Sequence, residues 1–176
     1  RMMMKYEERG VPLLDLDPER DSLLREAIEG LTRDPKTLPC KLLYDRRGSI
    51  LFDRICDLEE YYPTRTELSI MRCYLEAMAE RIGPGAMIIE YGSGSCLKTR
   101  LLLEMVADPA AYVPIDISRE HLLDSARNLS GEFPEIPILP VCADYTTDFD
   151  IPNPPRSESR RVVYFPGSTI GNFHPK

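Results

Sequence analysis

The chain has 176 residues, and its 22 Lys and Arg against 29 Asp and Glu give a formal net charge of −7. A hydrophobic fraction of 43% and a charged fraction of 29% are typical of a globular domain, and they exclude a disordered or fibrous chain. An acidic chain is poorly suited to a nucleic-acid backbone, and no apolar run approaches the roughly 18 residues of a membrane span. We therefore expect a small-molecule partner, with no nucleic acid and no membrane involved.

The first 85 residues predict helices and no strands. Residues 1–16 are expected to form an N-terminal tail. A helix follows, for which Asp17 is a suitable cap and Pro18 suits the first turn. The apolar residues of this helix recur at helical spacing and would form one stripe: Leu24, Ile28 and Leu31.

Two further helices complete a helical N-terminal segment at residues 17–85. One is expected from about Ser49, after the sequence KLLYDRRG. The other follows YYPTRTE, with Thr64 or Thr66 as a suitable N-cap, and Gly83 with its Pro-Gly neighbours ends it. Its apolar residues recur at spacings of three and four: Leu68, Met71, Leu75, Met78 and Ile82.

From residue 86 onward the pattern changes to alternating strands and helices. The predicted strands are AMIIEYG, YVPIDIS, IPILPVCADY and the start of RRVVYFPGSTIGN, and the predicted helices are LKTRLLLEMVA and SREHLLDSARNLSGEF, with Ser118 as the cap of the second. Strand–helix–strand alternation with short connections is typical of an α/β fold with a parallel, doubly wound sheet. Residues 86–176 are therefore expected to supply the first four strands of such a sheet.

The cysteines and histidines indicate the compartment. The five cysteines form no close pair, no C-x-x-C occurs, and His121 and His174 are the only histidines. The sequence therefore predicts neither a metal site nor a disulfide framework. The first residues also lack the apolar stretch of a secretory signal, so we expect a cytoplasmic protein.

Candidate ligand-binding residues fall at the ends of three successive strands. Glu90-Tyr91-Gly92-Ser93-Gly94-Ser95 follows the first strand, Asp116 ends the second, and Asp144 with Tyr145 ends the third. A lone G-x-G is as well explained by a tight strand-to-helix turn. In an open parallel sheet, however, ligands bind at the carboxyl ends of the strands, and an acid there can accept the hydroxyls of a ribose. The combination favours a nucleoside site over simple caps or solvated turns.

The type of nucleoside follows from what the glycine turn lacks. A dinucleotide fingerprint needs a small residue where this chain has Leu97, which argues against a nicotinamide-dependent oxidoreductase. No phosphate-binding P-loop occurs either. The acids after the strands fit S-adenosylmethionine better than NAD, so a methyltransferase is expected at the level of the fold.

Several longer blocks resemble the histidine-specific Nα-methyltransferase family. They are KLLYDRRGSILFDRICDLEEYYPTRTE, EYGSGSCLKTRLLLE, VPIDISREHL, PVCADY and FPGSTIGNFHP, in the family's order from about Leu38 to the last residue. The family's best-known members make the trimethylbetaine of histidine in ergothioneine biosynthesis. The resemblance implies a Rossmann-like, class I methyltransferase sheet that uses S-adenosylmethionine. It also implies transfer of methyl groups to the α-amino nitrogen of histidine, giving the trimethylated betaine, or to that of a related amino acid.

The resemblance also implies roles for individual residues. The positions that match S-adenosylmethionine contacts are Gly92, Lys98, Asp116, Asp144 and Tyr145, with Lys98 reaching the methionine carboxylate. Without such a role Lys98 would be an unusual choice, because a cation at a helix N-terminus opposes the helix dipole.

Further matches concern the amino-acid substrate. Tyr61 and Asn172 match positions that hold its α-amino and α-carboxylate end, while Tyr44 and Gly167 line the pocket more peripherally. The helical segment 17–85 would thus carry part of the substrate pocket. No catalytic base is assigned, because the nearby His174 lies after PGSTIGN, near the end of the sequence.

Similar proteins continue well past this point, with the rest of the sheet and a second domain that reads the imidazole ring. The resemblance therefore implies a truncated chain whose substrate selectivity lies partly elsewhere. The main alternative is a non-catalytic S-adenosylmethionine-binding module.

Overall fold

The computed structural model describes residues 5–6, 10–16 and 20–173. The strands are β1 (Lys5–Tyr6), β2 (Pro12–Asp15), β3 (Ala86–Tyr91), β4 (Ala111–Asp116), β5 (Val141–Cys142) and β6 (Arg160–Tyr164). The helices are α1 (Arg20–Thr32), α2 (Arg46–Cys56), α3 (Tyr62–Ile82), α4 (Leu97–Met105) and α5 (Arg119–Glu132), with two 3₁₀ helices, η1 (Cys40–Leu43) and η2 (Thr169–Asn172).

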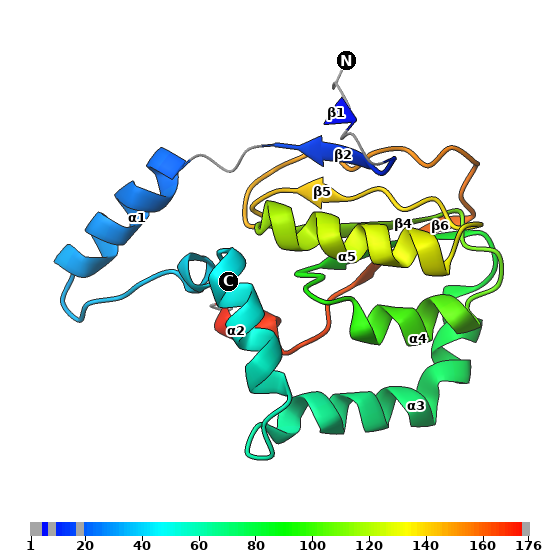
Figure 1. The fold of residues 1–176 in the computed structure, drawn as a ribbon, viewed down its shortest axis with the longest axis horizontal. Helices are drawn as coiled ribbons and strands as arrows, with labels where there is room; N and C mark the ends of the chain where they lie inside the picture. The colour runs from blue at the N-terminus through cyan, green and yellow to red at the C-terminus, as the bar shows by residue number, and fades with distance from the viewer. Residues whose placement is uncertain (1–4, 7–9, 17–19, 174–176) are drawn as a thin grey trace.

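These strands form one sheet in the order β1-β2-β5-β4-β3-β6. Figure 1 shows the part of this order that runs from β1 through β2 and β5 to β4. The five strands from β2 to β6 pair in parallel, and β1 runs antiparallel to β2. The expectation of an α/β fold with a parallel sheet is therefore confirmed. The order reverses at β3, which has β4 on one side and β6 on the other.

The N-terminal residues depart from the prediction of a tail and of an all-helical first 85 residues. Residues 12–15 form β2, which lies beside β5 with Leu14 opposite Val141. Leu13 and Leu14 are both buried, and the two leucines belong to different core clusters. The prediction failed because four residues are too few to show a strand period. The partner strand also lies far along the sequence.

The core has two layers, one on each face of the sheet. Side chains of β3 alternate between them: Ile88 belongs to the cluster on one face, and Met87 and Ile89 to the cluster on the other. The first face is covered by buried residues of α3, α4 and α5. The second is covered in part by Phe149 and Ile151, from the connection between β5 and β6.

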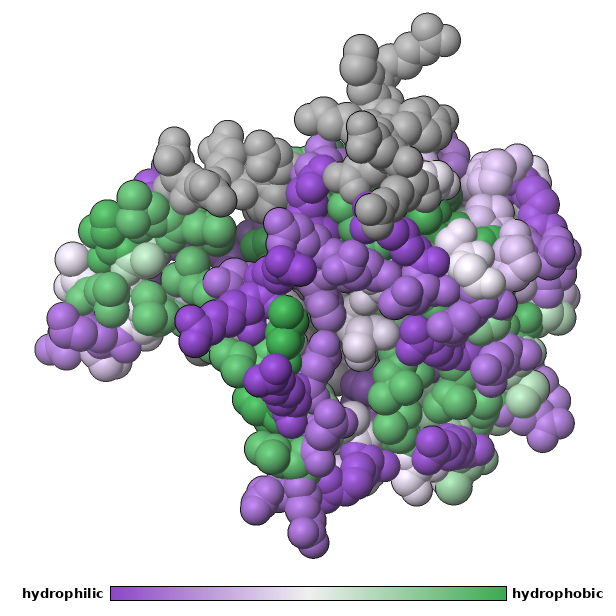
Figure 2. Space-filling view, in the orientation of Figure 1, coloured by the Kyte–Doolittle hydropathy of each residue, from purple (hydrophilic) through white to green (hydrophobic). Residues whose placement is uncertain are grey.

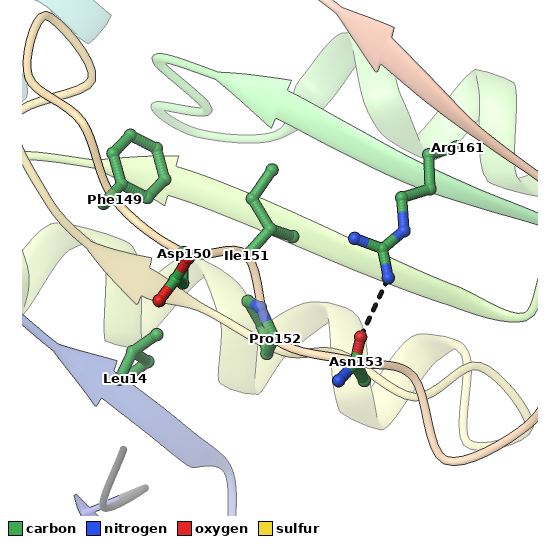
Figure 3. Close-up of a pocket in the computed structure, with 7 residues that line it drawn as sticks. All are labelled: Leu14, Phe149, Asp150, Ile151, Pro152, Asn153 and Arg161. Carbon is green, nitrogen blue, oxygen red and sulfur yellow. Dashed lines mark hydrogen bonds between the residues drawn. The ribbon is translucent and has the colours of Figure 1, made fainter. Parts of the chain in front are cut away.

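A cavity of about 740 Å³ lies on this second face (Figure 3). Leu14, residues 149–153 and Arg161 line it, and the Arg161 guanidinium donates a hydrogen bond of 2.9 Å to the Asn153 side chain. None of the predicted site residues is part of its lining.

The observed helix starts differ in part from the predicted N-caps. Asp17 and Pro18 lie outside the described residues. Helix α2 begins at Arg46, three residues before Ser49, because Asp45 caps it by accepting a 2.6 Å hydrogen bond from the Gly48 amide.

Helix α3 begins at Tyr62, so the prediction that Thr64 or Thr66 caps it is wrong. Pro63 is accommodated in the first turn, where a missing N–H leaves no helical bond unmade. At the other end Gly83 terminates the helix with a φ of +76°, as predicted.

Two predictions for the later elements also need correction. Ser118 occupies the N-cap position of α5 but its hydroxyl makes no capping bond. The third strand is limited to Val141–Cys142 with an isolated bridge at Ile138, because Pro137 and Pro140 have no N–H to donate to a ladder.

The apolar stripe of α1 faces solvent. Leu24, Ile28 and Leu31 are all exposed, and hydrophobic residues gather on the lobe that this helix forms (Figures 1 and 2). No described helix is both long enough and apolar enough to cross a membrane.

A buried carboxylate connects β3, β4 and α4. Glu90 is only 2% exposed, and its side chain accepts hydrogen bonds from the hydroxyls of Thr99 and Tyr112. Burial raises the Glu90 pKa from 4.5 to about 7, while the two hydrogen bonds oppose this rise. The network fixes the end of β3 against the start of α4.

The burial of β2 predicts a large cost for truncating Leu13. Leu13→Ala should lower the free energy of unfolding by about 2–5 kcal/mol, because the side chain is 0% exposed. Leu24→Ala is the matched control, and its 61% exposed side chain should cost less than about 0.5 kcal/mol. Urea unfolding followed by circular dichroism measures both, and equal losses would contradict β2 as a core strand.

The raised pKa of Glu90 predicts a pH dependence of stability. The folded state holds the Glu90 proton more tightly than the unfolded chain, so the free energy of unfolding falls as pH rises from 4.5 to about 7. This loss amounts to about 3 kcal/mol at roughly 1.4 kcal/mol per pH unit. Glu90→Gln removes the titrating group, so urea titrations across this range should give the variant a flatter profile. Parallel profiles for the two proteins would show that Glu90 does not titrate there.

Candidate functional site

A cavity of about 1150 Å³ opens at the carboxyl ends of β3, β4 and β5. It lies where the strand order reverses, which is the usual ligand position in an open parallel sheet. The residues that line it come both from the sheet ends and from the helical segment before β3. Every predicted site residue lines this one cavity: Tyr44, Tyr61, Gly92, Lys98, Asp116, Asp144, Tyr145, Gly167 and Asn172.

The glycine turn after β3 lets the backbone fold back toward β4. Gly92 and Gly94 have φ values of +68° and +49°, in the left-handed region that favours glycine. The Gly92 amide donates to the Ile115 carbonyl at 2.9 Å. In the same turn the buried Ser93 hydroxyl has no hydrogen-bond partner among the described residues, so it is available to a ligand.

Asp116 lies at the end of β4 beside this turn and is 9% exposed. Its Oδ1 accepts a hydrogen bond from the Ser118 amide at 2.9 Å, and its Oδ2 accepts one from the Gly94 amide at 3.2 Å. Burial raises the Asp116 pKa, although these amide bonds oppose the rise. Two carboxylate oxygens have about four acceptor sites, so the group can still accept two hydroxyls from a ligand.

Asp144 has partners that the sequence did not predict. Lys41 of η1 contacts its Oδ2 at 2.5 Å, and the same ammonium contacts Glu26 of α1 at 2.8 Å. Burial opposes ionisation of Asp144, but hydrogen bonds from Lys41 and Thr146 outweigh it and lower the pKa. A cation shared by two acids therefore connects the helical segment to the end of β5.

Aromatic side chains cover the sheet end of the cavity. Tyr145 stacks on Tyr91 with ring centroids 5.5 Å apart and an interplanar angle of 17°. Phe165 and Phe173 approach Tyr145 edge-on at 5.7 and 6.3 Å. Burial raises the pKa of Tyr145 to about 12, so its hydroxyl stays protonated at neutral pH. Of these rings, Tyr145 and Phe173 line the cavity, where an aromatic ring can pack against a ring-shaped ligand.

A second aromatic group lies on the helical side of the cavity. Phe52 contacts Tyr44 and Tyr61 edge-on, with centroid distances of 6.1 and 6.0 Å. Burial raises the pKa of both tyrosines, so both hydroxyls are neutral donors at physiological pH. Tyr61 is also the N-cap residue of α3, which fixes its backbone beside the cavity.

Lys98 and Gly167 both contact Glu67, a residue for which the sequence analysis predicts no role. Glu67 of α3 contacts the Lys98 ammonium at 2.6 Å through Oε2 and accepts a 2.9 Å hydrogen bond from the Gly167 amide through Oε1. Glu67 is the last residue of YYPTRTE, and membership of that block was the one signal that pointed to it.

The chain is also similar in sequence to known proteins. The family described as histidine-specific, SAM-dependent methyltransferases matches residues 23–176. A histidine N-alpha-methyltransferase of Mycolicibacterium smegmatis is 39% identical over 166 residues, covering 92% of this chain and 50% of the relative. The ergothioneine biosynthesis protein 1 of Neurospora crassa is 36% identical over 144 residues, covering 80% of this chain and 16% of the relative.

A relative that acts on another amino acid is also similar. The 4-dimethylallyltryptophan N-methyltransferase of Aspergillus fumigatus is 30% identical over 178 residues, covering 92% of this chain and 50% of the relative. The chain thus spans about half the length of the Mycolicibacterium and Aspergillus relatives. Because the family matches residues 23–176, which is most of this chain, the chain belongs to the histidine-specific, SAM-dependent methyltransferases.

Proposed function

We propose that the complete protein transfers methyl groups from S-adenosylmethionine to the α-amino nitrogen of histidine and yields its trimethylated betaine. The observation that carries this proposal is the single cavity shared by the candidate cofactor residues and the candidate substrate residues. These residues come from segments as distant as Tyr44 and Asn172, and the family match supports the same reaction class.

The residues around the cavity fit S-adenosylmethionine. Asp116 has acceptor capacity for the two ribose hydroxyls, and Tyr145 with Asp144 is suited to the adenine ring and its amino group. The Ser93 hydroxyl offers an unused polar group, and Lys98 offers a cation for the methionine carboxylate. The strand order β5-β4-β3-β6 supports classification as a Rossmann-like, class I methyltransferase sheet.

When bound, S-adenosylmethionine supplies a methyl group on a positively charged sulfur that a neutral amine can attack. The amino acid arrives mainly as an ammonium, so one proton must pass to solvent before each transfer. Tyr61 and Asn172 would orient the amine through hydrogen bonds without adding a fixed charge. Asn172 carries both donors and an acceptor, so it can keep a hydrogen bond to the substrate as each methyl replaces an N–H.

Two further assignments accompany this function. The helical residues before β3 supply Tyr44 and Tyr61 to the cavity, which supports a substrate-binding role for this segment. No disulfide joins the cysteines among the residues that the structure describes, which supports a cytoplasmic, reducing compartment.

Cofactor binding can be tested through Asp116. Asp116→Ala should weaken S-adenosylhomocysteine binding by about 1–3 kcal/mol, because two ribose hydroxyls lose their acceptor. If Asp116→Ala does not fold, Asp116→Asn, which retains one acceptor oxygen, is measured in its place. Asp124→Ala, at an exposed position, is the control. Isothermal titration calorimetry gives the affinities. Equal binding by the folded variants would remove Asp116 from the site, and tighter binding of NADH by the wild type would refute the cofactor assignment.

The reaction can be tested by locating the methyl groups. Incubation of the complete protein with histidine and S-adenosylmethionine should give a product with three methyls on the α-nitrogen, as fragmentation mass spectrometry would show. Tyr61→Phe should raise the KM for histidine about five- to ten-fold by removing one hydrogen bond, and it should spare S-adenosylhomocysteine affinity.

The neighbouring Tyr62 is 66% exposed, so Tyr62→Phe is the matched control and should change neither value. Methyls on the imidazole, or a clear preference for a tryptophan derivative, would contradict the assigned substrate. Cofactor binding with no methyl transfer to any amino acid would favour the non-catalytic module.

A further inference from the structure

Three elements that surround the cavity meet at the Glu67 carboxylate. Glu67 lies in α3, Lys98 in the first turn of α4, and Gly167 in the turn between β6 and η2. Each oxygen of Glu67 has a separate partner: Oε2 contacts the Lys98 ammonium at 2.6 Å, and Oε1 accepts from the Gly167 amide at 2.9 Å.

The packing at this point leaves little freedom. Gly167 has a φ of +84°, and a Cβ atom built on it would lie 3.3 Å from the Lys98 ammonium nitrogen. The lysine head group is therefore confined between the Glu67 carboxylate and the Gly167 backbone. An ammonium has three donors, so Lys98 can keep its contact with Glu67 and still donate to a second carboxylate in the cavity.

We propose that Glu67 is a positioning residue, which holds Lys98 for the carboxylate of S-adenosylmethionine and holds the turn that leads to Asn172. The proposal rests on the proposed function, because it takes Lys98 as the partner of that carboxylate. Neither the cofactor nor the amino acid needs to touch Glu67 for this role.

The charges explain why such a residue is needed. Lys98 stands in the first turn of α4, where its charge opposes the helix dipole and favours displacement of the side chain into solvent. The negative charge of Glu67, on the neighbouring helix, offsets this effect. A long, flexible side chain that is already ordered loses less conformational freedom when its ligand binds.

The second contact extends the role to the substrate side. The Gly167 amide is fixed by Glu67, and η2 with Asn172 begins two residues later. Loss of the carboxylate should therefore loosen the turn as well as the lysine. Amide hydrogen exchange at residues 167–172 reports this effect without any turnover.

A pair of ligands separates positioning of Lys98 from a general structural role. S-adenosylhomocysteine carries the carboxylate, whereas 5′-methylthioadenosine has the same nucleoside without it. In calorimetric titrations Glu67→Ala should weaken S-adenosylhomocysteine about ten-fold and change methylthioadenosine less than about two-fold. Glu67→Gln keeps the side-chain length and one acceptor oxygen, so its loss should be smaller. Glu76→Ala, at an exposed position of the same helix, should bind both ligands like the wild type.

A double-mutant cycle tests whether Glu67 acts through Lys98. Lys98→Met should itself weaken S-adenosylhomocysteine, and adding Glu67→Ala to it should cause no further loss. The proposal would be overturned by additive losses of affinity in the double mutant. It would equally be overturned if Glu67→Ala weakened both ligands to the same extent, or left S-adenosylhomocysteine affinity unchanged. If Glu67→Ala does not fold, Glu67→Gln with the same two ligands decides. A wild type that binds neither ligand would instead refute the proposed function.

Discussion

The arrangement of the site depends on the position of β3 in the sheet. This strand pairs in parallel with β4 on one side and with β6 on the other, so the three chain segments that leave them start from one edge. The glycine turn, Asp116 and the turn at Gly167 are therefore close together without any special local conformation in the strands. The buried Glu90, which Thr99 and Tyr112 hold, keeps this end of β3 fixed against α4.

Two lysines then attach the helical segment to that edge. Lys41 joins α1 and η1 to the end of β5 through Glu26 and Asp144, and Lys98 joins α4 to α3 through Glu67. The Lys41, Lys98 and Asp144 side chains retain less than a fifth of their exposure, so solvent screens these pairs less than ordinary surface pairs. Two of the acids that pair with these lysines, Glu26 and Glu67, are not candidate ligand-binding residues. The cavity is thus assembled by charges that the cofactor does not itself supply.

The sequence predicted the part of this architecture that depends on local signals. Strands β3 and β4 and helices α4 and α5 have clear periods and short connections, and the residues at their ends could be placed at one edge of a sheet. Strand β2 was not predicted, because its partner lies far along the chain. The third strand is shorter than predicted, because Pro137 and Pro140 have no N–H to donate to the ladder. The pairing of Lys41 with Asp144 links residues 103 positions apart, and no local pattern reports such a contact. The roles of the cavity residues remain predictions that rest on the family resemblance.

The place of β2 beside β5 has a consequence for synthesis of the protein on the ribosome. Leu14 and its partner Val141 are separated by roughly 130 residues, which at about 5–20 residues per second corresponds to a delay of about 6–25 seconds. During this interval Leu13 and Leu14 have left the exit tunnel while the strand that will bury them does not yet exist. Strand β2 is therefore among the last parts of the sheet to assemble, although the ribosome makes it before β3, β4 and β5.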